Sequence, residues 1–96
     1  LERRFQVVHI EEADPSQTIK ILKGVKHVYE NHHQVKIHDG ALQKCVELSD
    51  RFLENQYFPG KAIKMLDSAC ASASLVGKNM VTAELVVKEF DRFLSP

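Results

Sequence analysis

The stretch DPSQTIKILKGVKHVYEN, residues 14–31, predicts how the fold begins. Asp14 can cap a helix, and Pro15 suits the first helical position because the N–H that proline lacks would have no partner there. Apolar residues then recur at helical spacing, which predicts a first helix that ends near Asn31. These apolar residues are Ile19, Ile21, Leu22, Val25, Val28 and Tyr29. Gly24 costs a helix about 1 kcal/mol relative to alanine, so we expect close packing around it.

Three further amphipathic segments follow this first helix. The second helix is expected to begin at His38 or Asp39 and to end near Glu54. Pro59 can open a third helix, and Thr82 can cap a fourth. The apolar faces predicted for the second and fourth helices include Phe52, Leu53, Val87, Phe93 and Leu94.

Short β-type runs complete the pattern. Residues 35–37 and 80–81 are expected to pair as a minimal two-stranded element. With four helices joined by short connections, they predict a compact, mainly α fold. Another β-type run, residues 5–10, precedes the first helix, and residues 11–15 break it.

Composition argues against several kinds of site and partner. The 96 residues fit one domain, and 13 basic residues balance 13 acidic ones, so we expect neither a nucleic-acid nor a membrane partner. No apolar run approaches the roughly 18 residues that a membrane span needs. The five histidines lack Cys or acidic partners at metal spacing, so no metal site is expected. Cys45 and Cys70 lie in apolar helical patterns and are expected to be buried.

Two features can bear on phosphate chemistry. Arg3 and Arg4 precede the β-type run of residues 5–10, and a guanidinium offers a rigid fork of donors to phosphate oxygens. Two solvated surface arginines are the plainer interpretation. The turn at residues 58–61 can neighbour an anion or simply start a helix. The chain opens without Met or a leader, so we expect it to begin inside a longer protein.

The residues alone also allow other classes of function. A free-standing helical module would bind a partner helix in a groove between the second and third helices. A small DNA-binding helix-turn-helix domain is disfavoured by the zero net charge.

Five motifs in order carry a resemblance to a known family. The chain closely resembles the Clp-type AAA+ unfoldases, ClpA, ClpB, ClpC and their relatives, and the matching part is the small helical lid of their first ATPase module. The motifs are LERRFQ (1–6), TIKILKGVK (18–26), YENHHQVKI (29–37), FPGKAI (58–63) and DSA (67–69).

The resemblance implies a role for each segment. Residues 1–10 would end the large AAA+ subdomain, and residues 11–96 would form the four-helix lid. Arg3 and Arg4 would reach a neighbouring subunit's ATP as trans arginine fingers. Residues from the first helix would contact adenine, and the turn before the third helix would approach the nucleotide from the other side. The residues implied are Ile19, Ile21, Leu22, Pro59, Gly60 and Lys61.

Cofactors and partners follow from the same resemblance. The parent would use ATP or ADP with Mg, whereas the isolated piece would need no cofactor and would not hydrolyse ATP, because it contains no phosphate loop. Partners would be neighbouring subunits of a homohexameric ring, unfolded or tagged protein substrates, and a Clp-type peptidase. The parent would work in the cytoplasm, or in the stroma or matrix of an organelle.

The sequence departs from the family pattern in three places. Gly60 and Lys64 stand where the family's usual Pro-Asp-Lys-Ala-Ile-Asp turn has acidic residues, and Ser68 replaces the Glu of the usual Asp-Glu-Ala. No coiled-coil insertion separates the third and fourth helices, which favours a ClpA-like arrangement.

Overall fold

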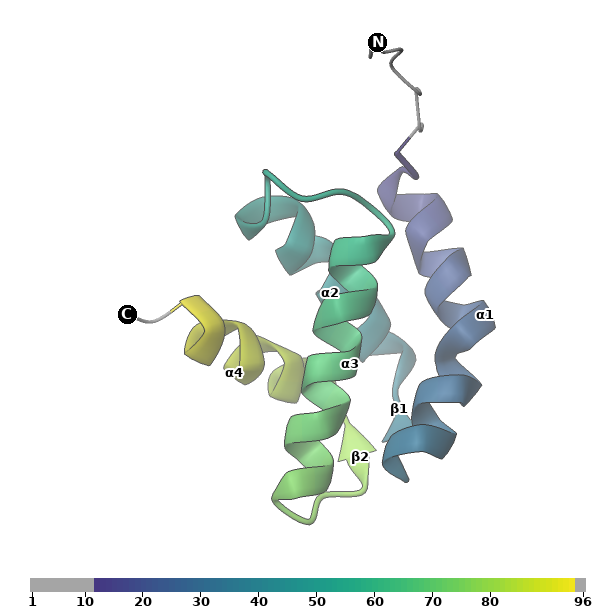
Figure 1. Cartoon of the computed structure of the whole chain (residues 1–96), viewed down its shortest axis with the longest axis vertical. Coiled ribbons are helices and arrows are strands. Elements are labelled where there is room, and N and C mark those ends of the chain that lie inside the picture. The colour runs from purple at the N-terminus through teal and green to yellow at the C-terminus, as the bar shows by residue number, and fades with distance from the viewer. Residues whose placement is uncertain (1–11, 95–96) are drawn as a thin grey trace, which may run out of the picture.

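The chain folds into four helices and two very short strands. A computed structural model describes residues 12–94. The elements are α1 (Pro15–His33), β1 (Lys36–Ile37), α2 (Asp39–Phe52), α3 (Gly60–Leu75), β2 (Met80–Val81) and α4 (Ala83–Leu94). Helix α3 packs against the other three helices, with α1 and α4 on opposite sides of it (Figure 1). The predicted mainly α fold with four helices and a minimal sheet is confirmed.

Local capping explains where α1 begins and ends. The Asp14 carboxylate accepts a 2.7 Å hydrogen bond from the Gln17 N–H, and the Gln17 side chain accepts one of 3.0 Å from the Asp14 N–H. This reciprocal pair confirms the predicted start. The helix ends at His33, two residues beyond the predicted end, because Gln34 adopts a left-handed conformation with φ of 57°. Its side-chain amide also donates to the Asn31 carbonyl.

The two strands pair in parallel, and α2 and α3 form the crossover connection between them. Lys36 lies opposite Met80, and Ile37 lies opposite Val81. One face of the pair is buried, with Ile37 and Val81 in the core, and the other is exposed. The predicted pairing of these two runs is therefore confirmed.

The core gathers apolar side chains from every element. Cys45 and Cys70 are free thiols within it, as predicted, and burial raises the pKa of each to about 12. The largest fully buried apolar side chains are Leu22, Leu42, Leu66, Val81 and Val86.

Several predicted core positions are wrong. Phe52 is 47% exposed and Phe93 is 57% exposed, and these residues are the last of α2 and the next to last of α4. The predicted close packing at Gly24 is also wrong, since a Cβ added there would meet no atom within 4 Å. The other exposed side chains expected on an apolar face are Ile21, Val28, Val87 and Leu94.

Candidate functional site

The segment before α1 and the turn before α3 are joined by two hydrogen bonds, although Glu12 and Phe58 are 46 positions apart in sequence. The Phe58 N–H donates to the Glu12 carboxylate at 3.0 Å, and the Ala13 N–H donates to the Phe58 carbonyl at 3.4 Å. The peptide bond between Phe58 and Pro59 is cis. These contacts bring together the two segments for which the family resemblance implies nucleotide contact.

A shared surface depression lies where these two segments meet. It encloses about 510 Å³, and its apolar wall combines Ile21 of α1 with Pro59 of the turn. Ile21 is 38% exposed, so its side chain is available to a ligand. The full lining is Glu12, Ala13, Gln17, Lys20, Ile21 and Pro59.

The other predicted nucleotide residues lie around this depression rather than in it. Leu22 is fully buried, and Ile19 is partly buried against the core. Gly60 lines a second depression of about 470 Å³ between α1 and α3, together with Tyr29 and Ile63. The structure thus brings Ile21 and Pro59 together, places Leu22 beneath the surface and sets Gly60 to one side.

Lys61 is directed into the domain. Its ammonium donates a 3.0 Å hydrogen bond to the Leu53 carbonyl and lies 4.4 Å from the centre of the Phe58 ring. Only 4% of the residue is exposed. The lysine therefore ties the turn before α3 to the end of α2, and its charge is compensated by a carbonyl oxygen and an aromatic face.

Ser68, which departs from the family pattern, and its neighbour Asp67 also have defined surroundings. Asp67 accepts a 2.7 Å contact from the His33 ring, which links α3 to the end of α1. Ser68 and Ser72 donate hydrogen bonds of 2.5 and 2.7 Å to the Glu89 carboxylate. Glu89 is only 7% exposed, so the serine that replaces the family's Glu at position 68 satisfies a buried carboxylate on α4.

Sequence reasoning missed two of these residues. Glu89 falls three positions after the buried Val86 on α4, and that helical spacing could have placed it on the buried face. Glu12 gave no comparable signal, because its partner at Phe58 lies far along the chain.

The lining of the depression is better suited to binding a flat ring than to catalysing the cleavage of a bond. Ile21 and Pro59 offer apolar contact to the face of a planar base such as adenine, and Gln17 and Lys20 add polar groups at the rim. What these groups can supply is binding and orientation. The residues present therefore fit the adenine end of a nucleotide.

Some predictions concern residues outside the described part of the chain. Arg3, Arg4 and the run of residues 5–10 lie there, as does the boundary between residues 10 and 11. Within residues 12–94, no three His, Cys, Asp or Glu side chains gather as a metal site would require. No helix in this range is long and apolar enough to span a membrane.

Comparison with known protein sequences finds relatives that match about three quarters of this chain. A chaperone protein ClpB from Bacteroides thetaiotaomicron is 51% identical over 71 residues, which cover 74% of this chain and 8% of that protein. A ClpB from Staphylococcus aureus is 50% identical over 72 residues, with 75% and 8% coverage. The chain thus spans about 8% of the length of these relatives. Since both are named ClpB, the ClpA-like arrangement stays a prediction.

Solved structures of Hsp104 share the fold of this chain. A closed-state structure of Hsp104 with ATPγS and FITC casein superposes with a TM-score of 0.86 at 33% identity, over 96% of this chain and 16% of that one. The Saccharomyces cerevisiae Hsp104–ADP complex gives 0.82 at 32% identity, over 95% and 16%. A family model described as the AAA lid domain matches residues 14–93. The chain therefore belongs to the AAA lid domain family, in the form found in Clp-type chaperones.

Proposed function

We propose that the chain is the nucleotide-contacting lid of the first ATPase module in a Clp-type, ATP-driven protein unfoldase. The observation that carries this proposal is the shared depression, where Ile21 of α1 meets Pro59 of the turn before α3. Membership of the AAA lid domain family and the nucleotide-bound Hsp104 neighbours support it.

In this proposal, the residues around the depression divide the work. Ile21 and Pro59 contact the adenine faces, while Ile19 and the buried Leu22 form the support beneath them. Gly60 leaves the neighbouring surface open, and Lys61 holds the turn in place through Leu53. ATP or ADP with Mg is bound by the whole parent, where ATP supplies the phosphoryl group that is hydrolysed and ADP is the product.

Substituting Ile21 tests the nucleotide contact. In the full-length parent, Ile21→Asp should weaken ADP binding by about tenfold or more, because a carboxylate replaces the apolar contact that Ile21 makes with adenine in this proposal. Val28→Asp is the matched control, since Val28 lies two turns along α1, is also exposed, and lines a different depression. Equal loss of affinity in both variants would contradict the contact.

The arginine pair supplies the second part of the proposal. Arg3 and Arg4 stabilise the charge on a neighbouring subunit's phosphoryl group, as trans arginine fingers do. Changing both to Ala in the parent should leave nucleotide affinity near normal and lower ATP turnover by about 10³-fold or more. Unchanged turnover would refute this assignment.

The whole parent's partners complete the proposal. The lid packs between subunits of a homohexameric ring and passes the ATP cycle to its neighbours while the ring unfolds protein substrates. The Hsp104 structure with casein supports a protein substrate. A Clp-type peptidase is a further partner to test by co-purification, and the cytoplasm is the expected compartment. The lid alone should not hydrolyse ATP, which an activity assay of the 96-residue chain would test.

A further inference from the structure

The outer edge of strand β2 has backbone groups without partners. The Lys36 N–H donates to the Asn79 carbonyl at 2.8 Å, and the His38 N–H donates to the Val81 carbonyl at 3.0 Å. Successive residues of a parallel strand use opposite edges, so the N–H and C=O of Met80 point away from β1. Among residues 12–94, no backbone hydrogen bond outside the helices and the ladder uses either group.

The opposite edge of the sheet is already covered. The Ile37 N–H donates to the Glu30 carboxylate at 2.8 Å, and the Val35 N–H donates to the Glu30 carbonyl at 3.1 Å. Helix α1 therefore closes the β1 side. A strand can be added only along β2.

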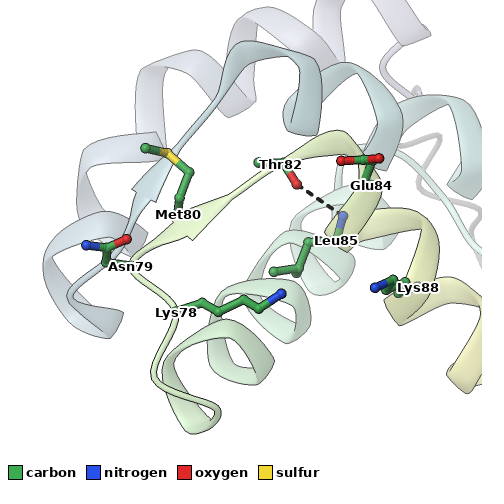
Figure 2. Close-up of a pocket in the computed structure, with 7 residues that line it drawn as sticks. All are labelled: Lys78, Asn79, Met80, Thr82, Glu84, Leu85 and Lys88. Atoms are coloured by element: carbon green, nitrogen blue, oxygen red, sulfur yellow. Dashed lines mark hydrogen bonds between the residues drawn. The ribbon is translucent and has the colours of Figure 1, made fainter.

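A groove runs beside this open edge, between β2 and the start of α4. It encloses about 380 Å³, and no residue of β1 lines it. Figure 2 shows Met80 and Asn79 at the strand, with Leu85 projecting from α4 on the other side. Met80 is 37% exposed, whereas Leu85 is partly buried and packs against the core. The groove thus offers both open hydrogen-bonding groups and apolar contact.

The charges around the groove favour an acidic occupant. Lys78 and Lys88 both line it, and Figure 2 shows the Lys78 side chain extending toward Leu85 and Lys88. Neither lysine forms an ion pair or side-chain hydrogen bond within the described residues, and only Glu84 contributes a carboxylate to the lining. Two cations against one anion leave a local positive excess.

We propose that the open edge of β2 binds an extended, acidic segment of a partner protein as a third strand. Such a segment would pair its backbone with the N–H and C=O of Met80, and its carboxylates would lie against Lys78 and Lys88. This surface is separate from the depression at Ile21 and does not depend on nucleotide.

The test is a titration of the 96-residue, ¹⁵N-labelled chain with two capped pentapeptides. One alternates Glu with Val, and the other alternates Lys with Val. The acidic peptide should shift the Met80 amide signal saturably and slow its hydrogen exchange by about fivefold or more. It should bind about tenfold more tightly than the basic peptide at low salt. Failure of both peptides to bind at millimolar concentration would overturn the proposal.

Variants separate strand addition from simple charge attraction. Met80→Pro removes the free N–H without removing a ladder bond and should weaken acidic-peptide binding about threefold to tenfold. Met80→Val keeps the N–H and should bind the acidic peptide as tightly as the unsubstituted 96-residue chain does. The double variant Lys78→Glu, Lys88→Glu should bind the basic peptide more tightly than the acidic one. If Met80→Pro does not fold, this double variant tests the proposal in its place. Unchanged affinity of the acidic peptide for the Met80→Pro variant would overturn the proposal. Self-association that protects the Met80 amide from exchange without peptide would also overturn it.

Discussion

The ammonium of Lys61 donates a 3.0 Å hydrogen bond to the carbonyl oxygen of Leu53, and both residues are buried. Leu53 follows the last residue of α2, where helix carbonyls lack partners within the helix. The lysine supplies one of these missing donors. It thereby fixes the connection that presents Pro59 to the surface depression.

Removing this ammonium should destabilise the domain. Lys61→Met keeps most of the buried stem but leaves the Leu53 carbonyl without its donor, which should cost about 1–3 kcal/mol in the free energy of unfolding. Lys64→Met, at an exposed lysine one turn along α3, should change it by less than about 0.5 kcal/mol. Urea unfolding of the two variants measures the difference. Equal stability would contradict the structural role of Lys61.

Removing the buried carboxylate of Glu89 should also lower the free energy of unfolding. Glu89→Ala leaves the hydroxyls of Ser68 and Ser72 without their acceptor and should cost about 1.5–3 kcal/mol. Glu84→Ala, at an exposed position on the same helix, serves as the control. A triple variant with Glu89→Leu, Ser68→Ala and Ser72→Ala should recover much of the loss, because apolar groups then replace the carboxylate and both hydroxyls, while the remaining partner, Arg92 at 3.6 Å, is exposed to solvent. A triple variant less stable than Glu89→Ala would contradict this account.

The cap of α1 should contribute a measurable share of stability. Asp14→Ala removes the acceptor of the Gln17 N–H and should lower the free energy of unfolding by about 0.5–2 kcal/mol. Ser16→Ala is the control, because Ser16 is exposed in the same turn. Thermal unfolding followed by circular dichroism compares them. Similar melting temperatures for the two variants would rule out a significant cap.

The buried thiols predict how stability depends on alkaline pH. Burial raises the pKa of Cys45 and of Cys70 from 9.0 to about 12, so the unfolded chain loses these protons first. Their stabilising effect is fully present below pH 9 and is lost as the pH rises toward 12. Unfolding free energies at pH 8 and 10.5 should therefore fall more in the parent chain than in a Cys45→Val, Cys70→Ala variant. A parallel fall in both would exclude a thiol contribution.

The thiols should also resist chemical modification. A thiolate is the reactive form, and both groups stay protonated in the native core. A thiol reagent at pH 8 should therefore react only at the rate of unfolding, and rapid stoichiometric labelling of the native chain would contradict this burial.

Features that depend on residues close together in the sequence were predicted correctly. Asp14 and Thr82 cap α1 and α4 as expected, because capping depends on residues within one turn. These two caps need no knowledge of distant neighbours. The pairing of β1 with β2 was also predicted, from two short β-type runs, although it joins Lys36 to Met80 across α2 and α3.

The other long-range contacts could not be predicted from sequence patterns. An apolar pattern indicates a face, but it does not say how far a neighbouring helix extends, and so Phe52 and Phe93 were wrongly expected to be buried. The burial of Lys61 depends on the Leu53 carbonyl, and that of Glu89 depends on serines of another helix. The depression likewise arises only when Ile21 meets Pro59, 38 positions later.

Photolabelling of the full-length parent with 8-azido-ATP tests the central proposal most directly. The reactive group sits on the adenine ring, so mass-spectrometric mapping of the labelled peptides reports where adenine lies in the assembled protein. We predict labelling in the peptide that contains Ile21, in the peptide that contains Pro59, or in both, with competition by unlabelled ADP. Labelling confined to peptides outside residues 12–94 would contradict the nucleotide role of this lid.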